Sequence, residues 1–255
     1  MKDFHIHTTF CDGNNTPEEM VVSAIEKGLT TIGFSAHSYT FFDESYCMKK
    51  ENIEAYKAEI SSLKEKYRGK IEILCGVEQD YYSDMSTADF DYVIGSVHYL
   101  KVGEEYFSID DDADILKSAC DKYYGGDFYL LCDDYFKTVA KVAEKTNADI
   151  IGHFDLVTKF NEKYNFFDEN DSRYAAAYRS AVDSLIKADI PFEINTGAIS
   201  RGYKSIPYPS QQILKYIAKK NGKVILSSDS HSTKGLCFEF EKWSAFARDM
   251  ELNLI

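Results

Sequence analysis

Residues 5–13 read HIHTTFCDG, so that two of the six histidines stand one residue apart and Asp12 follows closely. On a β-strand, residues i and i+2 point to the same face, which would set His5 and His7 side by side. An isolated His-x-His is more often a pair of surface histidines on a strand edge than a pair of metal ligands. The choice between these interpretations depends on where the other histidines fall in the chain.

The composition is typical of a soluble globular enzyme, with 255 residues, of which 44% are hydrophobic and 15% aromatic. The net charge of −13 argues against a surface that binds a nucleic-acid backbone, so we expect no nucleic-acid partner. A small anionic substrate is compatible with this charge, because bound metal ions can set the local potential. No nucleotide-binding loop of Walker spacing and no G-x-S-x-G motif occurs, which leaves ATP-driven chemistry and serine hydrolysis without support.

The cysteines are scattered and form no C-x-x-C pair, so we expect reduced thiols rather than a disulfide framework. Residues 1–3 lead directly into a strand pattern, which leaves no room for a signal peptide. No apolar run approaches the roughly 18 residues of a membrane span. A cytoplasmic protein without a membrane partner is therefore expected, whereas the sequence does not indicate an oligomeric state.

Strand patterns alternate with helix patterns along the chain, which favours a parallel α/β sheet. The strand patterns after residue 149 are apolar runs, as expected when both faces of a sheet are covered. The seven strand patterns cover residues 3–7, 30–35, 72–77, 92–97, 149–153, 191–195 and 224–228.

Helix patterns fill the intervals. Residues 16–28, TPEEMVVSAIEKG, carry an N-cap threonine, a proline at the first helical position, a glutamate three residues after the cap and a terminal glycine. Further helices are predicted over 51–69, 133–146, 172–188, 209–221 and 239–250. Residues 101–128 are expected to form a long loop with a little helix that caps one side of the mouth. No linker or repeat interrupts the chain, so one domain over 1–255 is predicted.

All six histidines lie at the carboxyl ends of predicted strands, and none lies in a predicted helix. This is the edge at which α/β barrels and open sheets place their active sites. Such segregation indicates a shared metal site and favours closure of the sheet into a barrel. The candidate ligands are His5, His7, Asp12, His37, Glu78, His98, His153, Asp229 and His231.

These nine side chains offer nitrogen and oxygen ligands, which suit Zn²⁺, Mn²⁺ or Fe²⁺. Nine ligands exceed the needs of one tetrahedral ion, so two or three divalent ions are expected, with a carboxylate such as Glu78 bridging a pair. Ions about 3.5–4 Å apart can ionise a bridging water near neutral pH and neutralise the oxygens of a phosphoryl group. Hydrolysis of a small-molecule phosphate ester is therefore the predicted reaction.

The motifs HIHTTFCDG, SAH, GVE, IGSVH, GHFD and SDSH, in this order, resemble those of the PHP (polymerase and histidinol phosphatase) superfamily. The resemblance spans almost the whole chain, and VIGSVH and FEINTGAISRGYKSIPYPS are similar to the histidinol-phosphatase branch. It implies a distorted (β/α)7 TIM-like barrel with a metal site at the C-terminal ends of the strands. The implied reaction converts L-histidinol phosphate to L-histidinol and phosphate, a step of histidine biosynthesis, by attack of a metal-bridging hydroxide.

The resemblance also implies a ligand set for each of three ions, and Glu78 and Asp229 are candidate catalytic residues as well as ligands. Family members usually read TDH where this chain has Ser35-Ala36-His37, so a carboxylate that would orient the imidazole is missing. The implied sets are His5, His7, Glu78 and Asp229 for the first ion; Glu78, His98 and His153 for the second; and Asp12, His37 and His231 for the third.

Two basic residues after the later strands are candidates for substrate binding. Arg201 follows the sixth strand pattern, and its planar guanidinium suits bidentate binding of phosphate. Lys159 follows the fifth, where family members often carry two adjacent basic residues and Thr158 takes the first place here. The alternative for both is a solvated loop side chain.

Asp155, two residues beyond His153, is a candidate to protonate the leaving alkoxide, although an aspartate there more often caps the following segment. Asn195 could position a substrate group or satisfy a strand end. The imidazole and amine of histidinol would need aromatic and acidic partners, for which Tyr99, Tyr106 and the aspartates at 110–112 are candidates. The DDD run could equally be a solvated loop or a helix start.

Two other functions remain open from the sequence. A phosphatase or phosphodiesterase acting on another small phosphoester or on a nucleotide would use the same metal ligands. A metal- or ligand-binding subunit without catalysis would also retain them.

Overall fold

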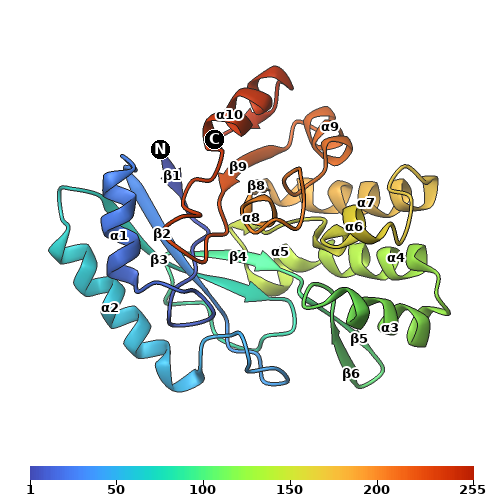
Figure 1. Ribbon diagram of the computed structural model, residues 1–255, viewed down its shortest axis with the longest axis horizontal. Coiled ribbons are helices and arrows are strands. Elements are labelled where there is room, and N and C mark those ends of the chain that lie inside the picture. The colour runs from blue at the N-terminus through green and yellow to red at the C-terminus, as the bar shows by residue number, and fades with distance from the viewer.

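Eight parallel strands form one curled sheet in the computed structural model, which describes residues 1–255. Helices cover its outer face, and the chain runs around the sheet from the N-terminus to the C-terminus (Figure 1). Neighbouring strands follow the order β1-β2-β3-β4-β7-β8-β9-β10. Their bounds are β1 Lys2–Asp3, β2 Thr31–His37, β3 Glu72–Asp80, β4 Tyr92–Ser96, β7 Ile150–Ile151, β8 Phe192–Asn195, β9 Lys223–Ser227 and β10 Asn253–Leu254.

The sheet closes where the segment after β1 meets the segment after β9. Ile6 forms a parallel bridge with Ser230, the His7 N–H donates to the Ser230 carbonyl at 2.8 Å, and the Ser230 N–H donates to the His5 carbonyl at 3.0 Å. At the opposite end, β10 pairs with the start of β9. The predicted distorted TIM-like barrel is confirmed, and β10 adds a short eighth strand to the seven that the sequence predicts.

The helices begin and end where local side chains satisfy their free backbone groups. At the start of α1, Thr16 accepts a hydrogen bond from the Glu19 N–H while the Glu19 carboxylate accepts one from the Thr16 N–H. None of the helices combines the length and the apolar character that crossing a membrane requires. The helices are α1 Pro17–Glu26, α2 Ile53–Lys66, α3 Ala113–Tyr124, α4 Phe128–Val139, α5 Val142–Thr146, α6 Asn161–Tyr164, α7 Ser172–Leu185, α8 Gly197–Ser200, α9 Gln211–Lys219 and α10 Phe240–Asp249, and a hairpin joins β5 Tyr99–Val102 to β6 Glu105–Ser108.

The apolar core lies between the strands and the helices. One cluster of 40 buried residues lies beneath α3, α4, α7, α9 and α10, and a second cluster of 17 lies beneath α1 and α2. Phe136 is among the largest fully buried side chains, and burial of such a ring stabilises the fold by about 1.5–3 kcal/mol. Because the apolar side chains face the helices, the inward faces of the strands at the mouth remain available for polar groups.

The segment over 101–128 is more regular than the sequence prediction, which was wrong in expecting a long loop. It contains the second strand of the β5–β6 hairpin and all of α3. Gly103 supplies the turn at φ 61°, and the Asp112 carboxylate accepts the Asp114 N–H at 2.7 Å to start α3. Gly125, at φ 63°, ends that helix. The tyrosines and aspartates that look irregular in sequence therefore belong to strand faces and a helix cap.

Two predicted boundaries also differ. The helix predicted over 133–146 begins earlier, at Phe128 after the Asp127 cap, and is divided into α4 and α5. The strand predicted over 3–7 pairs as a ladder only over Lys2–Asp3, because the residues that follow turn toward Ser230.

Candidate metal centre and active site

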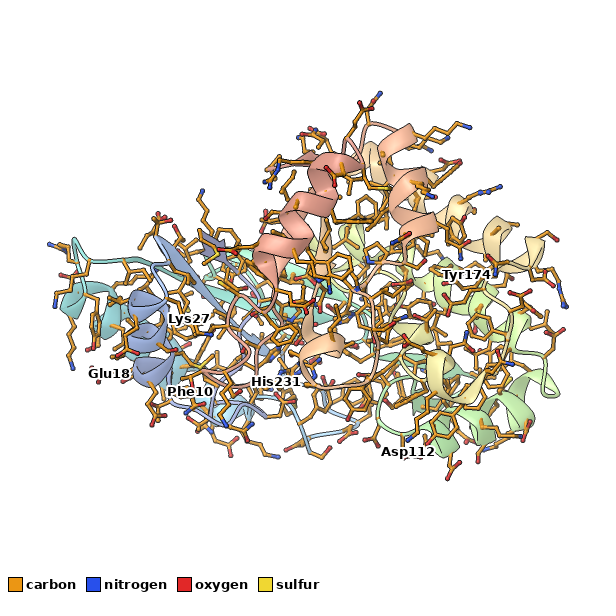
Figure 2. The ribbon with its side chains drawn as sticks, turned by 45° about the horizontal axis from the view of Figure 1, so that its top comes forward. Phe10, Glu18, Lys27, Asp112, Tyr174 and His231 are labelled. Carbon is orange, nitrogen blue, oxygen red and sulfur yellow. The ribbon has the colours of Figure 1, made fainter.

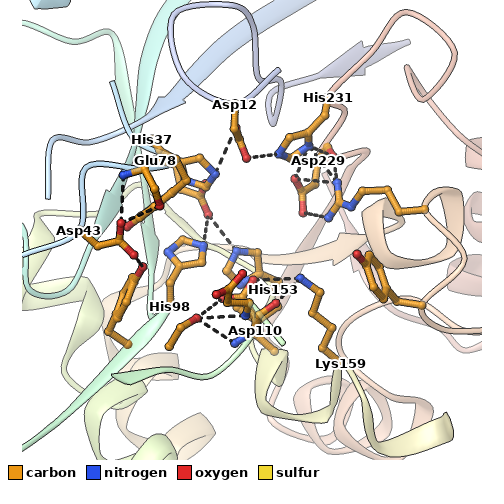
Figure 3. Close-up of a pocket in the computed structure, with 18 residues that line it drawn as sticks. Asp12, His37, Asp43, Glu78, His98, Asp110, His153, Lys159, Asp229 and His231 are labelled. Carbon is orange, nitrogen blue, oxygen red and sulfur yellow. Dashed lines mark hydrogen bonds and ion pairs between the residues drawn. The ribbon is translucent and has the colours of Figure 1, made fainter. Parts of the chain in front are cut away.

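The side chains predicted as metal ligands come from six strands or the residues after them and meet at one end of the barrel, and Figure 3 shows those that line the cavity. Parallel strands deliver their carboxyl ends to the same rim, which explains the convergence. His231 lies near the middle of the molecule in Figure 2, whereas Glu18 and Asp112 lie at its periphery. His5 and His7 follow β1, Asp12 lies in the next turn, His37 ends β2, Glu78 lies within β3, His98 follows β4, His153 follows β7, and Asp229 and His231 follow β9.

Glu78 occupies the centre of this group and is 1% exposed. One of its oxygens, Oε2, faces three imidazoles, and the other, Oε1, faces two more. A carboxylate placed in this way can bridge two metal ions. The distances from its oxygens to the nearest ring nitrogens are 3.2 Å for His5, 3.5 Å for His7, 2.9 Å for His37, 3.3 Å for His98 and 2.8 Å for His153.

The spacing of the ligand atoms fits divalent metal ions. Tetrahedral ligands at zinc bond lengths lie about 3.3–3.6 Å apart, and His7 Nε2 lies 3.4 Å from Asp229 Oδ1. His5 Nε2, His7 Nε2 and Glu78 Oε2 are buried and make no hydrogen bond within the protein. Three groups bring ligand atoms within 4.8 Å of one another, namely His7, Asp12, His37 and His231; His5, His7 and Asp229; and His37, Glu78 and His98.

The electrostatics of the site favour ionised carboxylates beside imidazoles. Burial would raise the pKa of Glu78, but the neighbouring His5 and His37 hold it well below its ordinary value. Burial, with His231 and His37 nearby, lowers the pKa of His7 to about 3. Against the effect of burial, the neighbouring carboxylates raise the pKa of His5 and His37, so a metal ion that binds these imidazoles would displace their protons.

The residue that departs from the family motif, Ala36, does not face the ligands. Its neighbour His37 points into the barrel, so the side chain at 36 points the other way along β2. Ala36 is fully buried in the apolar cluster with Met20 and Tyr56, beneath α1 and α2. A carboxylate at this position would enter that apolar layer, so the alanine suits its surroundings.

A cavity of 290 Å³ opens beside the ligands. It is mixed in character, with acidic, basic and aromatic side chains around the metal-ligand groups (Figure 3). Besides seven of the predicted ligands, the wall is formed by Asp43, Ser45, Tyr46, Tyr99, Ser108, Asp110, Asp111, Leu156, Lys159, Arg201 and Tyr203.

Both basic side chains predicted to bind substrate lie on this wall. Arg201 donates from Nη1 to the Asp229 carbonyl at 2.6 Å and from Nη2 to the Asp229 carboxylate at 3.1 Å. Lys159 donates to the Asp110 carbonyl at 2.6 Å and lies 4.8 Å from the centre of the Tyr203 ring. The guanidinium is therefore next to a predicted metal ligand, and the ammonium faces the same cavity.

Asp155 lies elsewhere. It is fully buried and is absent from the cavity wall, and its carboxylate accepts the Ser210 N–H at 3.0 Å. Burial raises its pKa to about 6. The chain turns into a short 3-10 helix over Leu156–Thr158 directly after it, which carries the side chain away from the mouth. The geometry therefore gives no support to the expectation that Asp155 protonates the leaving group.

Some of the residues predicted to recognise the imidazole and amine of histidinol line the cavity, and others do not. Tyr99, Asp110 and Asp111 line the cavity, whereas Tyr106 and Asp112 do not. Sequence reasoning missed Asp43 and Tyr46, which lie on the loop after β2. The Tyr99 hydroxyl donates to Asp43 at 2.6 Å, so the two elements form one corner of the wall. Both residues follow the strand that ends in His37, and this position in the sequence could have indicated that they lie near the cavity.

Two further carboxylates contact ligand histidines and were also missed. Asp80 accepts the His98 N–H at 3.0 Å and lies 3.3 Å from His98 Nδ1. Glu193 lies 2.6 Å from His5 Nδ1. Carboxylates in such positions fix the ring orientation and tautomer of a ligand histidine. The sequence signal was a polar residue on the inward face of a buried strand, two positions from another polar residue.

Comparison with known proteins places these observations in a family. The PHP domain model matches residues 3–197. A probable histidinol-phosphatase of Deinococcus radiodurans is 28% identical over 249 residues, covering 93% of this chain and 89% of that protein. The histidinol-phosphatase of Bacillus subtilis is 25% identical over 266 residues, covering 94% of this chain and 97% of that protein.

Two solved structures share the fold. The putative histidinol phosphatase HisK of Listeria monocytogenes has a TM-score of 0.83 at 21% identity and covers 95% of this chain and 100% of that chain. The histidinol phosphate phosphatase of Lactococcus lactis, solved with Zn, L-histidinol and phosphate, has a TM-score of 0.72 at 21% identity and covers 100% and 95%. With the family model matched over most of its length, this chain belongs to the PHP domain family.

Proposed function

We propose that this protein is a metal-dependent phosphatase that hydrolyses L-histidinol phosphate to L-histidinol and phosphate, the phosphatase step of histidine biosynthesis. The observation that carries the proposal is Glu78, whose oxygens lie within 3.5 Å of ring nitrogens of five histidines beside a cavity that also contains Arg201 and Lys159. The substrate is supported by the relatives named histidinol-phosphatase and by the L. lactis protein solved with L-histidinol and phosphate.

The proposed cofactors are two or three divalent ions, Zn²⁺, Mn²⁺ or Fe²⁺. When bound, such ions lower the pKa of coordinated water and neutralise charge on phosphoryl oxygens. The whole of residues 1–255 acts as one domain in this proposal, because Asp229 and His231 lie beyond the matched segment 3–197 yet reach the same group of ligands. The side chains that would hold the ions are His5, His7, Asp12, His37, Glu78, His98, His153, Asp229 and His231.

The chain's own charged groups orient the ester. Arg201 would turn part of its guanidinium from Asp229 to the phosphate, where two parallel N–H donors match two oxygens. Lys159 would add a second positive charge on the same wall. Across the cavity, the Asp43–Tyr99 corner offers a carboxylate and an aromatic ring to the imidazole and the cationic amine of histidinol.

Replacing Arg201 by methionine is expected to lower kcat/KM for L-histidinol phosphate about 100-fold, because a charged donor to the reacting phosphate is lost. The matched control is Arg68→Met, which removes an exposed arginine on the outer surface and should leave the kinetics unchanged. Steady-state phosphate release measures both. Wild-type kcat/KM in the Arg201 variant would contradict the phosphate-binding role.

The substrate assignment is tested by phosphate release from L-histidinol phosphate, a nucleoside monophosphate and an aryl phosphate diester, each with protein reconstituted separately with Zn²⁺, Mn²⁺ and Fe²⁺. A strong preference for L-histidinol phosphate is expected. Turnover of a comparator with none of L-histidinol phosphate would keep the metal chemistry and replace the substrate. Tight metal binding without turnover of any ester would indicate a binding subunit instead.

A further inference from the structure

β8 differs from the other strands that build the mouth, because it brings no side chain to the proposed ligand groups. Its apolar residues, Phe192 and Ile194, pack into the large outer cluster. Its alternate residues, Glu193 and Asn195, therefore face the barrel interior, and both are fully buried. A carboxylate in such a place is costly unless hydrogen-bond donors surround it.

The donors around Glu193 belong to the proposed ligands and to Asn195. His5 Nδ1 donates to one carboxylate oxygen at 2.6 Å. The backbone N–H of His153 donates to the other at 2.9 Å, and Asn195 Nδ2 donates to that same oxygen at 3.0 Å. One carboxylate thus joins a ligand side chain after β1 to the backbone of a ligand after β7.

Asn195 extends the connection to a third ligand. Its Nδ2 lies 3.4 Å from Asp229 Oδ2, and its side-chain oxygen accepts the Gly197 N–H at 2.9 Å. His5 and Asp229 belong to the same group of ligand atoms, with His7. Glu193 and Asn195 therefore contact two of the three members of that group, His5 and Asp229.

The orientation of His5 follows from these contacts. With Nδ1 donating to Glu193, the proton that a metal ion would displace is the one on Nε2, so Nε2 is the nitrogen left to bind the ion. His5 Nε2 lies 3.2 Å from Glu78 Oε2 and 3.9 Å from Asp229 Oδ1. Without the Glu193 acceptor, the ring would be free to carry the proton on either nitrogen and to rotate.

We infer that Glu193 is a positioning residue that fixes the tautomer of His5 and, through Asn195, the place of Asp229, and so sets the affinity of the His5–His7–Asp229 group for a divalent ion. The inference rests on the proposed metal binding and not on the proposed substrate. Removal of the Glu193 charge weakens metal binding at this group and leaves the metal-free fold in place.

The test compares zinc binding by wild type, Glu193→Gln and Glu193→Asp. Glutamine has one oxygen for three donors, so its amide N–H groups face either His5 Nδ1 or both the His153 N–H and Asn195 Nδ2. Competition against a zinc chelator is expected to give about 10- to 100-fold weaker binding for Glu193→Gln. Aspartate keeps the charge and should recover part of the affinity. Asp91→Asn is the matched control, because Asp91 accepts the Cys75 N–H at 2.7 Å at the far end of the strands.

A second readout needs no variant. In the zinc-loaded wild-type protein, the His5 Nδ1 proton should give a strongly downfield, exchange-protected resonance, with Nε2 bound to zinc. Wild-type zinc affinity in Glu193→Gln would overturn the inference. So would a metal-free form of this variant that loses as much free energy of unfolding as the variant loses in free energy of zinc binding. Zinc bound through Nδ1 of His5 would overturn it too. Wild-type protein that binds no divalent ion would overturn both this inference and the proposed function.

Discussion

Glu78→Gln is expected to lower kcat/KM for phosphate release by about a thousandfold or more. Replacing a residue that only hydrogen-bonds to a metal ligand already lowers metal affinity or activity by about 10- to 100-fold, and Glu78 is itself a proposed ligand. Glu78 is the side chain that touches both sides of the site, with Oε2 at 2.9 Å from His37 and Oε1 at 2.8 Å from His153. Glutamine keeps the size but loses the negative charge and one of the two acceptor oxygens. It can no longer bridge two cations.

The measurement is steady-state phosphate release together with metal content per chain. Both are expected to fall in Glu78→Gln while the circular dichroism spectrum stays that of the wild type. Glu72→Gln is the matched control, because Glu72 begins the same strand and its carboxylate accepts a hydrogen bond from the Thr31 hydroxyl, at 2.9 Å, away from the proposed ligands. If Glu78→Gln retained a tenth of the activity with its metal content intact, Glu78 would not bridge the ions.

Removal of divalent ions is expected to abolish turnover and to lower the thermal midpoint. A ligand at a hundredfold excess over its Kd stabilises the native state by about 2.7 kcal/mol, which for a chain of this length raises the midpoint by about 5 °C per bound ion. The stabilisation arises because the carboxylates and imidazoles at the mouth are buried. Cations bound between them balance the negative charge of the carboxylates and occupy the imidazole nitrogens.

Differential scanning calorimetry before and after chelator dialysis measures this effect, and readdition of Zn²⁺ or Mn²⁺ should restore both the midpoint and the activity. Mg²⁺ serves as the control ion, because it prefers oxygen ligands and the site is rich in imidazole. An unchanged midpoint and unchanged turnover after complete chelation would contradict metal-dependent hydrolysis.

The convergence of the proposed ligands could be predicted from the sequence because one rule governs it. Every proposed ligand except Asp12, which lies in the turn beyond His7, stands near the carboxyl end of a parallel strand, and parallel strands bring those ends to a single rim. The rule needs only the strand positions, and errors of two or three residues at strand boundaries do not change the rim to which a histidine is delivered. His5 and His7 illustrate this, because they reach the site although the β1 ladder ends at Asp3.

Residues off the strands followed no such rule. Asp155 lies two residues past His153, and a strand would have put both on one face; the 3-10 helix that begins at Leu156 breaks that alternation. The loop carrying Asp43 and Tyr46 reaches the cavity through tertiary contacts, such as the Tyr99 hydroxyl to Asp43, that no local pattern predicts. Arg201 was found because it lies soon after β8, where the same strand-end rule still applies.

Glu193 was missed, and Asn195 was considered only as a substrate-positioning or strand-end group, for a different reason. The alternation in FEIN shows that both face one side of β8, but the sequence does not reveal which side meets the ligands. Their partners are 188 and 34 residues away, at His5 and Asp229. Such long-range contacts depend on closure of the barrel, which the sequence favoured only through the placement of its histidines.

The central claim, that the nine side chains at the mouth bind divalent ions, is tested most directly by anomalous diffraction at the zinc absorption edge from crystals of zinc-loaded protein. The proposed centre predicts two or three anomalous peaks within bonding distance of these side chains, with Glu78 contacting two of them. Anomalous peaks confined to other parts of the surface, or none at full zinc loading, would contradict it.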